Sequence, residues 1–364
     1  MNLLVISTAP YTLGGISVVL KTIHTNKVFE NHKVTFHFTP PCDMKMVQDL
    51  KNEGYEVIIG HNRLHHPLKF IRSLKKLIKS RNYDIVHVHG NSHTMSLELL
   101  AAKLAGCPIR IAHAHSTKCN SLFLHKFLSP IFNKLCTHRF ACGIEAGKFM
   151  YGKKNYTVIN NGMELAKFQF NETNRTATKT DYDLKNKIVI GNVANFVEVK
   201  NHNFMIDVFA ELCKNNENYV LMLLGKGSLM NGIKEKVHAL GLDKKVLFIG
   251  STPNVHKYLS AMDIFILPSL YEGVPLTLIE AQSNGLKCIA STNVPEEVNI
   301  TKNVEFLPID AGTSVWVERL KNIDLTGDRE YASNEAIKKI TAAGYDINTQ
   351  AEKVVNYYRK ATEK

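Results

Sequence analysis

Short apolar, β-branched runs alternate with helical stretches along most of this chain, and this alternation constrains the fold more than any other feature. In the first half the runs are NLLVIST, KVTFHFT, YEVIIG, DIVHVHG, IRIAHAH, RFACG and YTVINNG. The pattern restarts in the second half with KIVIGNVA, YVLMLLGKG, KVLFIGS, IFILPS, KCIAS and VEFLP. Strands that alternate with helices form parallel sheets with helices on both faces. The sequence therefore predicts two doubly wound, Rossmann-like α/β domains that face a cleft.

The length of the chain supports two domains, because 364 residues exceed one ordinary hydrophobic core. We predict an N-terminal domain over 1–170 and a C-terminal domain over 188–345. The polar stretch NETNRTATKTDYDLKNK between them predicts a linker over 171–187. The last residues, 346–364, have the pattern of a final amphipathic helix, which could return to the N-terminal domain.

Composition favours a globular protein of the cytoplasm. Hydrophobic residues make up 45% of the chain and charged residues 21%, and no apolar run approaches the roughly 20 residues that span a bilayer. The opening MNLLVISTAP has no basic leader, so we interpret it as a first strand rather than a secretion signal. The seven cysteines form no CxxC pair, which is typical of free thiols in a reducing compartment.

Positive charge is concentrated in the first half of the chain. Residues 1–180 hold 24 Lys and Arg against 10 Asp and Glu, whereas residues 181–364 hold 21 against 23. Two segments, 65–82 and 122–135, are both basic and apolar, and the first spaces Leu68, Ile71, Leu74 and Leu77 for one helix face. They suit helices that bind an anionic lipid surface at the inner side of the cell membrane. Helices packed on their own sheet with a wet lysine face would give the same pattern.

Candidate ligand groups occur where strands end, which is where open α/β sheets bind their ligands. Gly14 and Gly15 follow the first strand and could let backbone N–H groups approach an anion, although an ordinary loop would look the same. His89 and His115 each end a strand and are candidates to touch a substrate. His87 and His113 lie two residues earlier on the same strand faces, and we interpret them as structural.

The sequence predicts neither a metal site nor nucleic-acid binding. No acidic or cysteine cluster accompanies the histidines, so we predict no metal site. The DxD sequence at Asp181 and Asp183 falls in the predicted linker and is interpreted as solvated. The basic charge lacks interleaved aromatic residues or a nucleic-acid-binding motif.

The second half offers its own groups at strand ends. Lys200 follows the strand KIVIGNVA, and Lys226 lies between two glycines in LLGKGSL, so each could neutralise a phosphate, although any single lysine is more often only solvated.

The stretch LPSLYEGVPLTLIEAQSNG, residues 267–285, places Glu272 before a helix start and Glu280 about one turn inside it. Gly273 allows an unusual backbone angle and Pro275 suits a first helical turn. The N–H groups of Val274, Leu276 and Thr277 would then be available to a diphosphate or a sugar. The glutamates could accept hydrogen bonds from sugar hydroxyls and from a ribose diol. Favourable helix-dipole contacts, with Glu280 facing solvent, are the alternative.

Together these residues resemble the retaining glycosyltransferases of family 4, which have the two-domain GT-B fold. The most specific match is the E-x7-E motif, here Glu272-GVPLTLI-Glu280. The resemblance extends to DIVHVHG, IRIAHAHST, the 158–168 stretch and FVEVKNHNF, and it is strongest to bacterial enzymes of capsular and exopolysaccharide synthesis.

The resemblance implies a nucleotide-diphosphate-sugar donor, with UDP the expected nucleotide, and a glycan or lipid-linked acceptor. It implies no cofactor beyond that co-substrate. Glu280 would bind the ribose and Glu272 the donor sugar, while residues 273–277 present backbone N–H groups. Lys200 would hold the diphosphate, approached by Gly15 from the other domain, and His115 would lie near the reacting sugar.

One position departs from the family pattern. Asn195 stands where an arginine is expected, and an amide brings no charge to a phosphate. Loss of such a contact could cost about 2–4 kcal/mol of transition-state stabilisation, for which Lys226 could compensate. A sugar epimerase or phosphorylase on the same fold, or a sugar-nucleotide-binding subunit without activity, are the alternatives.

Overall fold

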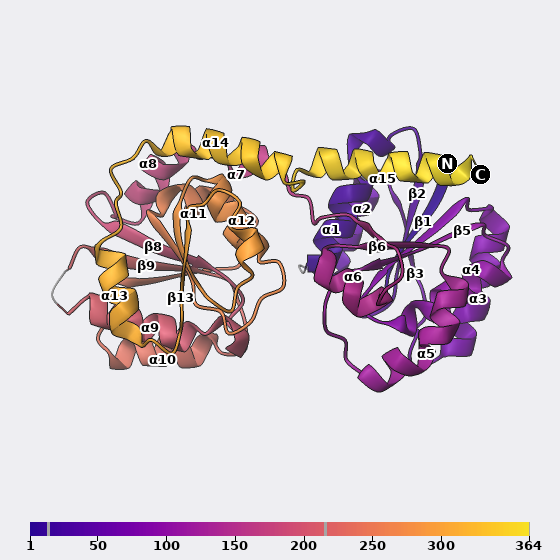
Figure 1. Ribbon diagram of the computed structural model, residues 1–364, viewed down its shortest axis with the longest axis horizontal. Helices are drawn as coiled ribbons and strands as arrows, with labels where there is room; N and C mark the ends of the chain where they lie inside the picture. The colour runs from indigo at the N-terminus through magenta and orange to yellow at the C-terminus, as the bar shows by residue number, and fades with distance from the viewer. Residues whose placement is uncertain (13–14, 215–216, 364) are drawn as a thin grey trace. The chain divides into compact units, whose positions relative to one another are not determined.

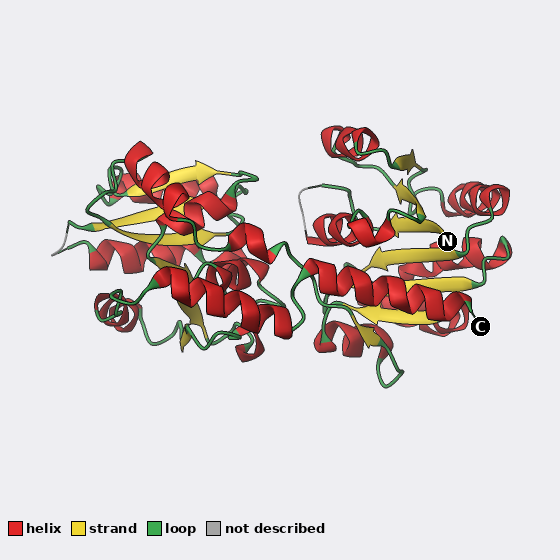
Figure 2. Ribbon diagram, turned by 90° about the horizontal axis from the view of Figure 1, so that it is seen from above, coloured by secondary structure: helices red, strands yellow, loops and turns green. Residues whose placement is uncertain are grey.

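The computed structural model describes residues 1–12, 15–214 and 217–363. These residues form two compact units, one of residues 1–163 and 344–364 and the other of residues 164–343. In each unit the strands lie between layers of helices (Figures 1 and 2). The prediction of two parallel-sheet, Rossmann-like domains is confirmed.

The sheet of the first unit has seven described parallel strands in the order β3-β2-β1-β4-β5-β6-β7. The strands are β1 Asn2–Ser7, β2 Lys33–Phe38, β3 Glu56–Ile59, β4 Ile85–Gly90, β5 Ile109–Ala114, β6 His138–Ala141 and β7 Thr157–Val158. The helices are α1 Gly15–His24, α2 Met44–Asn52, α3 Pro67–Arg81, α4 Ser96–Leu104, α5 Leu122–Leu135, α6 Ile144–Tyr151 and α15 Ile347–Thr362, with short turns η1 Lys27–Phe29 and η2 His93–Met95.

The strands of this sheet contribute side chains to two hydrophobic cores, one on each face, because successive side chains point to opposite faces. Leu4 and Ile6 of β1 pack with α3, α4, α5 and α6 on one face. Leu3 and Val5 pack with α1, α2 and α15 on the other. The final helix therefore does return to the N-terminal unit.

The second unit has six described parallel strands in the order β10-β9-β8-β11-β12-β13. They are β8 Ile188–Val193, β9 Tyr219–Leu224, β10 Val246–Gly250, β11 Ile264–Leu267, β12 Lys287–Ser291 and β13 Val304–Leu307. The helices are α7 Leu165–Phe168, α8 Glu172–Asp181, α9 His202–Leu212, α10 Met230–Ala239, α11 Val255–Ala261, α12 Leu276–Ser283, α13 Thr313–Lys321 and α14 Arg329–Ala342, with short turns η3 Glu198–Lys200 and η4 Glu296–Val298.

Both sheets reverse their strand order at one place. The reversal falls between β1 and β4 in the first unit and between β8 and β11 in the second. At such a switch point the connecting loops diverge and leave a crevice outside the carboxyl ends of the strands. The loops after β8 and β11 are thus where the second unit is built to receive a ligand.

The predicted linker over 171–187 is wrong, because this segment contains α8. Asn171 caps the helix by accepting a hydrogen bond from the backbone of Asn174 at 2.8 Å. Arg175 and Lys179 then hold the two carboxylate oxygens of Asp263 at 2.6 and 3.0 Å. These contacts make the segment part of the second unit, and the chain passes between the units at residues 163–164 and 343–344.

The two basic segments of the first unit differ in structure. In α3 the buried side chains are Phe70, Leu74 and Ile78, while Leu68 is 68% exposed. Of the predicted apolar face, Leu74 is buried and Ile71 and Leu77 pack partly buried against the same core, so the prediction fails only at Leu68. The helix α3 packs on its own sheet, and its lysines are exposed. In the part of the chain that the structure describes, no helix combines the length and the apolar character needed to cross a membrane.

Candidate functional site

The loop after β11, residues 268–275, fixes Glu272 at the carboxyl end of the sheet. The Glu272 carboxylate accepts a hydrogen bond from the Ser269 hydroxyl at 2.7 Å and lies 2.5 Å from Lys200 Nζ. Ser291, the last residue of β12, donates to the Ser269 carbonyl at 2.5 Å and so holds the base of the loop. Only 9% of the Glu272 side chain is exposed. The carboxylate is therefore held by a charge and a hydroxyl in a largely dry position.

Lys200 reaches Glu272 because two loops are tied together at the switch point. Lys200 ends η3, the turn that follows β8, and the backbone N–H of Leu270 donates to the Val199 carbonyl at 2.8 Å. The ion pair thus joins residues 72 positions apart in sequence. Lys200 and Glu272, which the sequence assigned to the diphosphate and the donor sugar, lie together, and their ion pair was not predicted. Their roles in donor binding stay predictions.

The start of α12 presents free backbone donors, as predicted. The helix begins at Leu276, with Pro275 as its N-cap rather than inside its first turn. Within residues 1–12, 15–214 and 217–363, the N–H groups of Val274, Leu276 and Thr277 donate to no protein acceptor.

The predicted unusual backbone angle at Gly273 is wrong, since its φ is not positive. A Cβ added there would meet no atom within 4 Å, so the position is open space.

Glu280 lies one turn inside α12 and is partly buried, so its solvent-facing alternative does not hold. Burial raises the pKa of the Glu280 carboxyl to about 7, and the positive charge of Lys167 acts in the opposite direction. No hydrogen bond to this carboxylate occurs within the described part of the chain. A desolvated carboxylate without a partner stores free energy that a hydroxyl donor could release.

Asn195 and Lys226 lie on adjacent loops after β8 and β9. The Phe196 N–H donates to the Lys226 carbonyl at 3.0 Å. Gly225 permits this approach, since its φ is +143° and a Cβ there would lie 1.9 Å from the Ala194 carbonyl oxygen. Both side chains are exposed, and among the described residues nothing pairs with the Lys226 ammonium. The positive charge missing at Asn195 is therefore available from the neighbouring loop.

In the first unit the two strand-end histidines, His89 and His115, contact each other, which was not predicted from the sequence. His89 is the fifth residue of β4, and His115 directly follows β5. Their Nδ1 and Nε2 atoms are 2.9 Å apart. Burial lowers the pKa of His115 to about 3, so the ring is neutral at physiological pH. Gly15 is the first residue of α1, while Gly14 lies outside the described residues.

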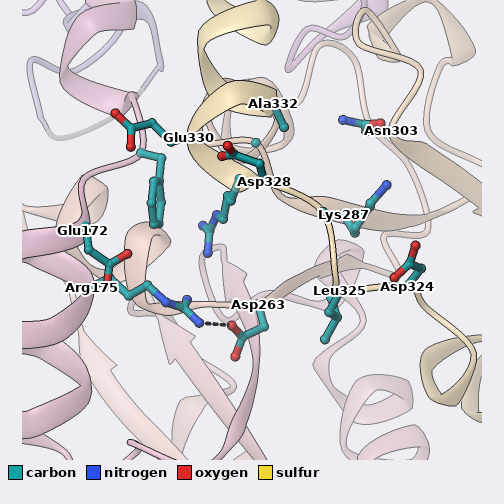
Figure 3. A pocket seen from close by; sticks show the side chains of 14 residues that line it. Glu172, Arg175, Asp263, Lys287, Asn303, Asp324, Leu325, Asp328, Glu330 and Ala332 are labelled. Atoms are coloured by element: carbon teal, nitrogen blue, oxygen red, sulfur yellow. Dashed lines mark hydrogen bonds and ion pairs between the residues drawn. The ribbon is translucent and has the colours of Figure 1, made fainter.

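A second hollow of the C-terminal unit lies at the opposite, amino end of its strands (Figure 3). This cavity of about 450 Å³ is lined by Asp263, which precedes β11, and by Lys287, which begins β12. Both of its arginines already have partners in the protein. Arg175 pairs with Asp263, and the Arg329 guanidinium donates to the carbonyls of Leu259 and Asn284 at 2.7 and 3.1 Å. The cavity is therefore a less suitable diphosphate site than the loops around Glu272.

The DxD residues, Asp181 and Asp183, are exposed at the end of α8 rather than in a linker. Neither lies near a strand's carboxyl end, and the absence of a role for metal remains a prediction.

The chain has two Rossmann-like units, and one of them carries a lysine-paired glutamate and free helix-start N–H groups at its switch point. This combination is typical of the GT-B class of glycosyltransferases. The model of the family "Glycosyl transferases group 1" matches residues 174–312, and that of "Glycosyltransferase Family 4" matches residues 13–166. The "Putative glycosyltransferase EpsF" of Bacillus subtilis (strain 168) is 33% identical over 96% of this chain and 94% of its own length. This chain belongs to the family 4 glycosyltransferases.

Other relatives carry more specific names. An Escherichia coli protein, "UDP-Gal:alpha-D-GlcNAc-diphosphoundecaprenol alpha-1,3-galactosyltransferase", is 36% identical over 62% of this chain and 62% of its own length. The crystal structure of Anabaena HepE in complex with UDP-glucose has a TM-score of 0.81, covers 99% of this chain and 100% of that chain, and is 15% identical. The structural match shows the shared fold.

Two residues of the site were not predicted from the sequence. They are Ser269 and Ser291, which support Glu272. Ser269 stands three residues before Glu272 at a strand end, so its spacing offered a signal. Ser291 offered none, because its contact depends on the neighbouring strand.

Proposed function

We propose that this protein transfers a sugar, with retention of its anomeric configuration, from a UDP-sugar to a lipid-linked glycan in cell-surface polysaccharide synthesis. The observation that carries the proposal is the Lys200–Glu272 pair at the β8–β11 switch point, next to the unpaired N–H groups of α12. The names of the E. coli relative and of the HepE complexes support a UDP-sugar donor.

Each group has a role in donor binding. The Val274, Leu276 and Thr277 N–H groups donate to the donor's sugar and phosphate oxygens. Glu280 accepts hydrogen bonds from the ribose diol. Glu272 accepts hydrogen bonds from the donor sugar, while Lys200 shares its charge between that carboxylate and the diphosphate. Since Glu272 is already oriented by Ser269, binding requires little reorganisation.

The chemical step is departure of UDP as oxocarbenium character develops at the anomeric carbon. Lys200 and the helix start stabilise the charge that grows on the leaving diphosphate. The acceptor hydroxyl attacks from the same face, and His89 and His115 line the acceptor side as neutral rings. No metal is needed for this step, because the developing charge is met by the lysine and the backbone dipoles.

Asn195 stands where the family has an arginine, so a positive charge near the diphosphate is missing. In this proposal Lys226 supplies that charge. The test is a pair of variants, Lys226→Ala and Asn195→Arg. Lys226→Ala should raise the KM for the donor or lower kcat by about tenfold or more, and adding Asn195→Arg should restore activity. If Lys226→Ala has no effect, Lys226 has no part in diphosphate binding.

A lipid-linked acceptor would place the first unit at the inner face of the cell membrane, and α5 has the surface for this. Phe123, Phe127 and Ile131 form a stripe spaced by four residues, and they are 75%, 65% and 47% exposed. Lys126 and Lys134 are exposed on the same helix. We expect the protein to float with anionic vesicles at low salt and Phe127→Ser to reduce that binding. Equal flotation with neutral and anionic vesicles would contradict a role for the charge.

The activity assay uses the full chain, UDP-glucose or UDP-galactose, and a polyprenyl-diphosphate-sugar acceptor. We expect an α-linked product by NMR and its loss in Lys200→Met. An inverted linkage would refute retention, conversion of the donor sugar without acceptor would indicate an epimerase, and tight UDP binding without turnover would indicate a binding subunit.

A further inference from the structure

Four histidines stand side by side on one face of the first unit's sheet. His87 and His89 lie in β4, His113 lies in β5, and His115 follows β5. Their odd-numbered positions match Ile85 and Ile111, so they face α1 and α15 rather than α3. The paired register aligns His89 with His113. His87, His89 and His113 are at most 1% exposed, and His115 is partly exposed at the strand's end.

The Leu20 carbonyl and the Tyr358 hydroxyl determine which ring nitrogens of His24 and His87 carry a proton. His24 Nδ1 lies 2.8 Å from the Leu20 carbonyl, so it carries the proton and leaves Nε2 as an acceptor. Tyr358 of α15 lies 3.1 Å from that Nε2 and donates to it. The Tyr358 oxygen then accepts from His87 Nδ1 at 2.5 Å. His24 and His87 are thus engaged as a structural relay between α1, β4 and α15.

The remaining rings keep nitrogen atoms without a hydrogen bond. These are His89 Nε2, His115 Nδ1 and both ring nitrogens of His113. Burial holds the pKa of His89 and His113 well below the ordinary value, with the neighbouring rings acting in the same direction. Neutral imidazoles expose a lone pair on one nitrogen, and a buried lone pair without a donor costs free energy.

The three rings converge. His89, His113 and His115 each offer one nitrogen, and these three atoms lie within 4.8 Å of one another. His89 Nδ1 and His115 Nε2 are hydrogen-bonded to each other at 2.9 Å, and a cation bound through these two atoms would replace the shared proton. Ligands about 2.0–2.1 Å from a tetrahedral Zn²⁺ lie closer together than this, so the rings need shift by only about 1 Å. The Ile159 backbone and the Asn161 side chain act on the pKa of His113 and His115, respectively, and so lie close enough to bond these rings when they turn toward a metal. Such outer partners orient the ligating rings in known metal sites.

We propose that His89, His113 and His115 form a site for one late first-row divalent cation of the Zn²⁺ type. Imidazole nitrogens suit this class, and three histidines with one open position are a known zinc ligand set. His115, at the end of β5, is the one of the three that is partly exposed. Because the ion would occupy the rings proposed for the acceptor side, its binding would inhibit transfer. The inference goes beyond the proposed function, whose chemical step uses no metal.

The test uses full-length, tag-free protein freed of metal by a chelator. Titration with Co²⁺ should give a visible absorption band of four-coordinate intensity that saturates at one equivalent, and Zn²⁺ should displace it. His113→Gln, which alters no group assigned to transfer, should weaken binding at least about 100-fold. His37→Gln is the matched control, since His37 is a buried ring of the same unit outside the cluster.

Three outcomes would overturn the proposal. One is the absence of saturable binding to the wild-type protein, and another is unchanged affinity in a folded His113→Gln variant. The third is loss of binding in His87→Gln but not in His113→Gln, which would move the ion to the other converging group, His24, His87 and His89. Thermal unfolding without metal establishes that each variant is folded. Since the band needs no substrate, it decides the proposal even if transfer is not detected.

Discussion

Glu280 should make the free protein less stable as the pH rises, and Glu280→Gln should remove that dependence. Burial raises the pKa of its carboxyl from the ordinary value of 4.5 to about 7 in the folded state. Between these values the folded chain binds more protons than the unfolded chain, so stability falls as the pH rises. Below pH 4.5 the carboxyl is protonated in both states, so Glu280 does not destabilise the folded state. Above pH 7 it is ionised in both states, and the destabilisation caused by burying the charged carboxylate is at its maximum.

The size of the effect follows from the shift. A difference of about 2.5 pKa units corresponds to roughly 3 kcal/mol at about 1.36 kcal/mol per unit. Glutamine has the shape of the protonated acid but cannot ionise. Any packing or hydrogen-bond cost of the substitution is therefore nearly the same at all pH values. The stabilisation by Glu280→Gln should be roughly 3 kcal/mol larger at pH 8 than at pH 4.5.

The assay is thermal unfolding of the wild type and the variant between pH 4.5 and pH 8. For a unit of this size, roughly 3 kcal/mol corresponds to a difference of about 6–12 °C in Tm. Glu235→Gln is the control, since Glu235 is exposed on α10 and should show no comparable pH dependence. A constant difference in Tm across the pH range would refute the buried, unpaired state of Glu280. A saturating UDP-sugar should stabilise the wild type more than the variant.

Three further predictions test the same structure. Lys200→Met should lower kcat by about 100-fold or more, because the negative charge on the leaving diphosphate is no longer stabilised by a cation. Steady-state kinetics measure this, and a circular-dichroism spectrum shows that the variant is folded. Gly225→Ala should destabilise the protein by roughly 2–4 kcal/mol, since the added Cβ would clash with a backbone carbonyl. Gly232→Ala, inside α10, should raise Tm slightly, because a Cβ there meets no atom within 4 Å. Phe127→Ser should leave Tm within about 1 °C of the wild type, because its side chain is 65% exposed. A large fall would show that the Phe127 side chain itself packs against the protein.

The strands could be predicted from the sequence because a buried parallel strand needs a continuous apolar run, and such runs are rare elsewhere. The segment 171–187 was misjudged because local composition was its only signal. What makes it a helix of the second unit is the contact of Arg175 and Lys179 with Asp263, more than 80 residues away. In α3, Leu68 fitted the apolar spacing as well as Phe70 did. Only the position of the sheet decides which of them is buried.

The site shows the same division. Glu272 and its helix-start loop could be located from sequence spacing, because the glutamate, the Gly-Val-Pro and the helix are consecutive. Lys200 is assigned to the same donor only through the family resemblance, and its ion pair with Glu272, 72 residues away, has no signal in the sequence. The apolar residues around Glu280 indicated a position beside a core, but the absence of a partner for its carboxylate had no local signal. It depends on how α12 packs against the rest of its unit.

The second unit, residues 164–343, is an insertion within the first, whose last segment is α15. During synthesis the ribosome therefore completes the inserted unit before the outer one. Until α15 emerges, the sheet face beneath it lacks Tyr358, Val354 and Ala351, which are buried there in the finished protein. We expect the N-terminal half to depend on its own distant end to fold and a chain stopped at residue 343 to need chaperones. The inserted unit should instead be exchangeable between relatives as one uninterrupted cassette.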